Sequence, residues 1–146
     1  MAFQNAYSAY QKTNVNTASQ GKLVVLLYEG AIKQLTMALN FIDENDKIKP
    51  QNIEKFGICL QKVQSIITEL QVSLDMEKGG AIATNLMALY VFFNEELVQA
   101  SITKDKGKIK SVLKMMSDLA ESWKIIANST ANAPAAQVEN ALNIMG

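Results

Sequence analysis

Residues 51–75, QNIEKFGICLQKVQSIITELQVSLD, carry the pattern that decides the fold. Apolar side chains recur there at alternating steps of three and four residues, which is the spacing of a helix face that packs against other helices. These side chains are Ile53, Phe56, Leu60, Val63, Ile67, Leu70 and Leu74. Pro50 precedes the run, where its fixed φ and missing N–H do no harm, and Gly79-Gly80 follow as an expected stop. The pattern predicts a helix over about 51–75.

Three further segments, about 20–44, 81–102 and 108–127, show the same helical period. The predicted core face of the first is Leu23, Leu27, Ala31, Leu35, Ala38 and Ile42. In 81–102 the face is Ile82, Leu86, Leu89, Phe93, Leu97 and Ala100, and in 108–127 it is Ile109, Val112, Met116, Leu119, Trp123 and Ile126. The connections DENDKIK, MEKGG and TKDKG are short, and short links join antiparallel neighbours. The sequence therefore predicts an all-α fold, an antiparallel up-down four-helix bundle over residues 19–128.

Two segments flank the predicted bundle. The extended leader 1–18 ends near Thr17 and Ser19, either of which is expected to accept a hydrogen bond as the cap of the first helix. The short tail 129–146 places Val138, Ala141, Leu142 and Met145 at helical spacing, but this run is too short to hold a helix alone.

Composition excludes most kinds of catalytic and metal site. The chain of 146 residues has no histidine and one cysteine, so it offers no imidazole base, no His-containing metal site and no CxxC pair. All fourteen basic residues are lysine and they balance fourteen acidic ones, a composition that disfavours nucleic-acid binding. The N-terminus lacks a signal peptide, and no apolar run is long enough to insert in a membrane. We expect a cytoplasmic binding protein, not an enzyme, with no metal and no cofactor.

The predicted helices are apolar over more than one core face. Three explanations stay open: a wider core, a homodimer face, or a groove for a partner helix, since large apolar patches on soluble proteins usually bind something. The surplus residues are Val24, Val25, Tyr28, Ile32, Leu39, Ile58, Ile66, Val72, Met87, Tyr90, Val91 and Val98.

Three stretches of the sequence resemble the FliS family of flagellar export chaperones. Residues 10–35 are YQKTNVNTASQGKLVVLLYEGAIKQL, with a tyrosine, V-x-T-A-S and L-Y-x-G-A in the family's order. Residues 66–100, IITELQVSLDMEKGGAIATNLMALYVFFNEELVQA, and 117–126, SDLAESWKII, are similar to the family's later helices. The family usually has proline after the V-x-T-A-S serine, where this chain has Gln20, and the tail 129–146 matches no part of the pattern.

The resemblance implies a chaperone that binds the disordered C-terminal segment of flagellin, blocks its premature polymerisation and keeps it competent for export. It also implies contact with the flagellar export gate and an N-terminal lid over an apolar groove. Carried over, the lid or its hinge would be Tyr7, Tyr10 and Val15, and the groove Tyr28, Ile32, Ile66 and Met87. The leader could instead be a fixed cap on the bundle. The alternative function is a homodimeric helical-bundle adaptor or a regulator-sequestering protein, without flagellin specificity.

Overall fold

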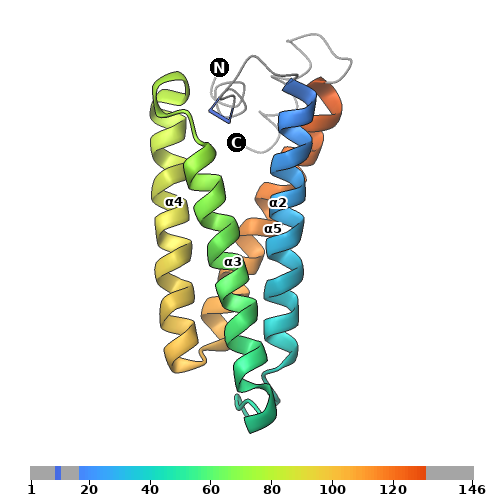
Figure 1. The fold of residues 1–146 in the computed structure, drawn as a ribbon, viewed down its shortest axis with the longest axis vertical. Helices are drawn as coiled ribbons and strands as arrows, with labels where there is room; N and C mark the ends of the chain where they lie inside the picture. Colours follow the sequence, from blue (N-terminus) through green and yellow to red (C-terminus); the bar gives the residue numbers. More distant parts are fainter. Residues whose placement is uncertain (1–8, 11–16, 131–146) are drawn as a thin grey trace.

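Four long helices, which run alternately up and down, form an antiparallel bundle (Figure 1). The computed structural model describes residues 9–10 and 17–130, and the side chains of 9–10 and 20–128. The elements are α2 (Thr17–Asn40), the short 3-10 helix η1 (Pro50–Asn52), α3 (Ile53–Ser73), α4 (Met76–Thr103) and α5 (Lys106–Thr130). The predicted all-α four-helix bundle is confirmed.

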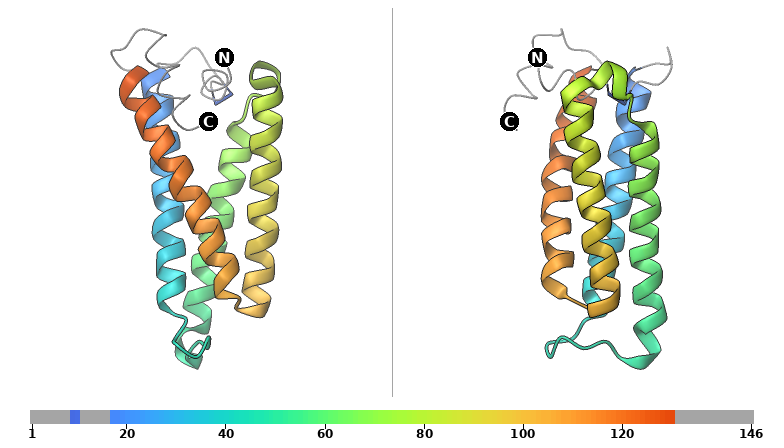
Figure 2. Two further views of the ribbon diagram at one scale, coloured as in Figure 1. Left: turned by 180° about the vertical axis from the view of Figure 1, so that it is seen from behind. Right: turned by 90° about the vertical axis from the view of Figure 1, so that its left-hand side faces the viewer.

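The four helices form a ring around one core. α2 packs most extensively against α5 and α3, and α4 closes the ring against α3 and α5. Figure 2 shows α5 close to α2 at the end of the bundle where α2 begins, and slanting toward α4 at the other end. The largest fully buried side chains come from all four helices and from the leader: Tyr10, Tyr28, Tyr90, Phe56, Phe93, Leu35, Leu60, Ile67, Leu70, Leu97, Ile109 and Met116.

In each helix at least one residue of the predicted core face is not fully buried. In α3 it is Ile53, which is 47% exposed, and in α5 it is Leu119, which is partly buried beside the buried Ala120. Leu27 of α2 and Ile82 of α4 are also only partly buried. Leu23 was assigned to the core of α2 but is 46% exposed, while Val24 and Tyr28 are buried. In α4, Tyr90 is fully buried and its neighbour Leu89 only partly. Steps of three and four from Ala31 reach Tyr28 as readily as Leu27, so period alone does not choose between them. The large rings of Tyr28 and Tyr90 take the core positions, and part of the apparent apolar surplus therefore belongs to a wider core.

The connection between α3 and α4 is shorter than predicted. α3 ends at Ser73 and α4 begins at Met76, so Gly79-Gly80 lie inside α4 and do not stop α3. Asp75 starts the new helix because its Oδ1 accepts hydrogen bonds from the N–H groups of Glu77 (3.1 Å) and Lys78 (2.9 Å). The helix then breaks at Gly80, whose φ of 52° and ψ of −129° are open to glycine.

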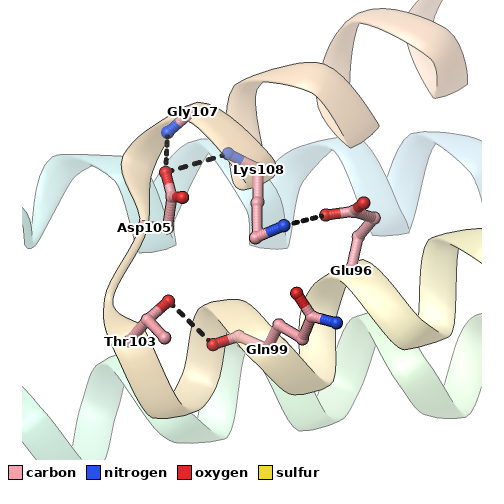
Figure 3. Close-up of polar contacts among 6 residues, drawn as sticks. All are labelled: Glu96, Gln99, Thr103, Asp105, Gly107 and Lys108. Carbon is pink, nitrogen blue, oxygen red and sulfur yellow. Dashed lines mark hydrogen bonds and ion pairs between the residues drawn. The ribbon is translucent and has the colours of Figure 1, made fainter.

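The connection between α4 and α5 is held by side chains at both helix ends (Figure 3). α4 ends at Thr103, and the next residue, Lys104, has a left-handed φ of 59°. Thr103 Oγ1 donates to the carbonyl oxygen of Gln99 at 2.9 Å. Asp105 Oδ1 accepts from Gly107 N at 2.9 Å, which caps α5. Lys108 Nζ lies 3.0 Å from Glu96 Oε2, so a half-buried ion pair ties the first turn of α5 to α4.

Candidate functional site

Two residues of the leader, Ala9 and Tyr10, lie between helices at one end of the bundle (Figures 1 and 2). Both are buried, with 0% and 1% of their surface exposed. They belong to no helix, yet they supply one of the largest buried side chains of the protein. This segment therefore completes the core from outside the four helices.

Tyr10 joins an aromatic cluster that we define as Tyr10, Tyr28, Tyr90 and Trp123. The hydroxyls of Tyr10 and Tyr90 are hydrogen-bonded, and the Tyr90 hydroxyl is also 2.6 Å from that of Tyr28. The Tyr10 ring meets Trp123 edge-on, with ring centroids 5.2 Å apart and an interplanar angle of 89°. Since α2, α4 and α5 each contribute one ring, Tyr10 links three helices through apolar and polar contacts at once.

Ala9 is held by the turn between α3 and α4. Its carbonyl oxygen accepts a hydrogen bond from the backbone N–H of Asp75. A Cβ added to Gly79 would stand 2.6 Å from the Cβ of Ala9 and 3.2 Å from its Cα, closer than such atoms approach. Glycine at position 79 therefore gives the leader room to lie against α4.

The phenols of the cluster are held in the neutral form. Burial raises the pKa of Tyr28 to about 12, against the opposing effect of its hydrogen bond to Tyr90. Burial, together with the nearby Tyr28 phenol, also raises the pKa values of Tyr10 and Tyr90 well above their usual value. The cluster is therefore uncharged across the physiological pH range and offers binding and packing but no acid–base chemistry near neutral pH.

The residues that the sequence assigned to a lid and a groove are not all brought together. Tyr10 and Tyr28 meet in the aromatic cluster, where Tyr28 is fully buried beneath the leader and lines no open groove. Ile66 lines a groove between α2 and α3, and Met87 Sδ accepts from Gln71 of α3 at 3.5 Å. Ile32 lies two turns along α2 from Val25, which lines a hollow beside α5.

Some predicted residues lie outside the part that the structure describes, and some residues of the site were missed. Outside the described part lie Tyr7, Val15, the side chains of Thr17 and Ser19, and the tail from residue 131 onward. The residues of the site that the sequence analysis did not assign to it are Tyr90, Trp123 and Gly79. Tyr90 stood among the surplus apolar residues, and its hydroxyl, which needs a partner when buried, was the signal that could have paired it with another tyrosine.

Comparison with known proteins shows which family the chain belongs to. A family model described as Flagellar protein FliS matches residues 3–130, which include most of the leader and all four described helices. The chain belongs to the FliS family. It is 36% identical over 124 residues to "Flagellar secretion chaperone FliS" of Bacillus subtilis (strain 168), covering 85% of this chain and 87% of the relative. The FliS relative of Salmonella typhimurium is 37% identical over 114 residues, 77% of this chain and 80% of its own length.

Membership of the FliS family settles the class of protein. A relative from Vibrio cholerae, also named flagellar secretion chaperone FliS, is 32% identical over 139 residues, 92% of this chain and 98% of its own. FliS proteins are export chaperones and not enzymes. No helix in the described part of the chain is both long enough and apolar enough to span a bilayer. Within the same residues, no three acidic or cysteine side chains gather as metal ligands.

Proposed function

We propose that this FliS-family chain is a cytoplasmic chaperone that binds the disordered C-terminal segment of flagellin and keeps it from polymerising before export. The names of the relatives support a secreted flagellar client. A helical bundle without catalytic groups suits this task, because amphipathic helices of a client bind in apolar grooves between helices. In the same proposal the loaded chaperone delivers its client to the flagellar export gate.

We further propose that the leader, residues 1–18, is a lid that the client displaces. The observation that carries this proposal is the burial of Tyr10, which lies outside the described helices, inside the aromatic cluster. A short segment can detach at a lower cost than unfolding the whole bundle. Its departure would uncover the rings of Tyr28, Tyr90 and Trp123 as an apolar seat with hydroxyl groups. The client then gains contacts that the lid gives up.

Calorimetry with a flagellin C-terminal segment tests the first proposal. The expected result is binding in the micromolar range or tighter, with a negative heat-capacity change from apolar burial. Circular dichroism must confirm that the chaperone is folded. No heat at high concentration of both components would refute flagellin binding. Removing residues 1–16 tests the lid, because unchanged client affinity would leave the leader as a fixed cap.

The second candidate is a homodimeric helical-bundle adaptor or a regulator-sequestering protein. Exposed apolar side chains on α4 favour it, since Val91, Val98 and Ile102 are 43%, 47% and 73% exposed. Light scattering of the protein alone distinguishes the two candidates. A dimer that stays intact and releases no heat with the flagellin segment would support the adaptor.

A further inference from the structure

A hollow of about 280 Å³ lies between α2 and α5, at the end of the bundle where α2 begins and α5 ends (Figure 1). It shares no lining residue with the aromatic cluster or with the groove between α2 and α3. It is therefore a separate surface of the bundle. Its walls are Lys22, Val25 and Leu26 of α2 and Lys124, Ala127 and Asn128 of α5.

The floor of the hollow is apolar and open. Leu26 is 64% exposed, Val25 is half-buried beside it, and Ala127 is buried at 6% exposure. An aliphatic side chain that packed on Leu26 would remove apolar surface from water on both partners, which is favourable in proportion to the area buried. The hollow is thus suited to a small number of aliphatic side chains.

The rim of the hollow is basic. Lys22 and Lys124 stand on its two walls, and no acidic side chain lines it. Lys124 Nζ is 3.7 Å from Glu29 Oε2 and 3.4 Å from Glu121 Oε1, but no ion pair among the described residues uses Lys22. An occupant with a carboxylate next to its apolar side chains would pair with Lys22.

The tail from residue 131 onward is attached beside this hollow. Asn128, in the wall, comes two residues before Thr130, where α5 ends. Pro134 has no N–H to continue a helix, so the chain can leave the axis of α5 there and turn back. The seven residues 131–137 span up to about 23 Å when extended. A short linker holds an attached segment at an effective concentration of about millimolar, an advantage over any separate partner.

The tail also carries the matching side chains. In a helix Val138 and Leu142 are one turn apart, about 6 Å along the axis, which equals the spacing of Lys22 and Leu26 on α2. Glu139 is the only charged residue among 131–146, and its charge is opposite to that of the rim.

We propose that the hollow between α2 and α5 is the docking site of this chain's own tail, residues 138–145. A segment of this length does not hold a helix alone, and packing on Leu26 supplies the apolar contact that it lacks. Leu142 would pack on Leu26, and Glu139 would pair with Lys22. The docked tail would join the end of α5 to the start of α2. The inference does not rest on flagellin binding, because every contact in it lies within one chain.

A spin label in the tail of the full chain tests the proposal. Asn143→Cys in a Cys59→Ala background carries the label next to Leu142, and NMR amide intensities are compared with the label oxidised and reduced. Leu26→Asp changes the hollow, and Leu142→Asp changes the tail. Ile102→Asp is the matched control, because Ile102 is 73% exposed in the last turn of α4, at the opposite end of the bundle. Circular dichroism confirms that each variant is folded.

In the parent chain and in Ile102→Asp, the oxidised label should remove most of the amide signal of residues 22–26 and 124–128. Leu26→Asp and Leu142→Asp should each restore that signal. Intact signals in the parent chain, or an equal loss in all variants, would overturn the proposal.

Two further samples test the charge pair and the occupant. Lys22→Glu should weaken the loss of signal, and adding Glu139→Lys should recover it, whereas no recovery would refute the pairing of these two residues. Labelled chains are also mixed with isotope-enriched chains that carry no label. A loss of signal in the enriched chains would overturn the proposal, because the tail would then dock on a second copy.

Discussion

Replacing Tyr10 by alanine should raise the affinity for the client. In a lid mechanism the apparent dissociation constant is the intrinsic one divided by the fraction of molecules whose lid is open. Tyr10 is 1% exposed, and burying a large side chain contributes about 1.5–3 kcal/mol. A loss of about 2 kcal/mol of lid docking corresponds to roughly a thirtyfold gain in apparent affinity. Tyr10→Phe loses one hydroxyl contact, worth about 0.5–1.5 kcal/mol, and should gain about two- to tenfold.

The single tryptophan reports the position of the lid in the same variants. Trp123 is 4% exposed and meets the Tyr10 ring edge-on, so an open lid should shift its emission to the red. The assay pairs calorimetry against the flagellin segment with the emission spectrum of each free variant. The size of both effects should follow the order wild type, Tyr10→Phe, Tyr10→Ala. A variant whose emission shifts while its client affinity falls would show that Tyr10 is part of the binding surface, and the lid reasoning would be wrong.

Three further predictions concern the lid seat, alkaline pH and the helix connection. Gly79→Ala places a Cβ 2.6 Å from the Cβ atoms of both Ala9 and Ala83, so it should displace Ala9, shift Trp123 emission and raise client affinity several-fold. Gly80→Ala meets nothing within 4 Å, so it should only lower the free energy of urea unfolding by about 1–2 kcal/mol, the cost of a side chain at a φ of 52°. Folding raises the pKa values of Tyr10, Tyr28 and Tyr90, so their contribution to stability is complete below pH 10 and is lost as pH rises from 10 toward 12. The free energy of unfolding should fall by up to about 1.4 kcal/mol per pH unit for each tyrosine. The same free energy of unfolding at pH 11 as at neutral pH would contradict the buried cluster. Lys108→Ala should lower the free energy of urea unfolding by about 0.5–1 kcal/mol, because it removes the half-buried ion pair with Glu96. Lys114→Ala removes an exposed ion pair with Asp118 and should lower it by less than about 0.5 kcal/mol. Equal decreases in the two variants would refute a special role for the Glu96 pair.

The bundle could be predicted because its signal is local and repeated. The run from Ile53 to Leu74 places an apolar residue at each step of a packed helix face, and the structure buries all of them except Ile53. The start of α4 was harder, because Asp75 begins a helix that Gly80 breaks one turn later. The glycine pair 79–80 predicts the end of a helix, but the Asp75 carboxylate caps a new helix, α4, before the pair is reached.

The site was less accessible to sequence reasoning because it depends on contacts between distant residues. Tyr10 and Tyr90 are 80 positions apart, and nothing in either local pattern says that their hydroxyls meet. The resemblance to the family directed attention to Tyr10 and Tyr28, but the other half of the cluster, Tyr90 and Trp123, came from packing alone. The close fit of Ala9 against Gly79 likewise appears only once the leader is placed in three dimensions.

A disulfide that locks the lid tests the central claim most directly. The Cβ atoms of Ala9 and Ala83 each lie 2.6 Å from the position that a Cβ of residue 79 would take, so they are no more than twice that distance apart. This upper bound is close to the roughly 3.5–4.5 Å between the Cβ atoms of a disulfide. Cysteines at both positions, in a Cys59→Ala background, give one protein in oxidised and reduced forms. We predict that the reduced form binds the flagellin segment and that the oxidised form binds it at least tenfold more weakly. Equal affinity in the two forms would contradict a client site beneath the leader.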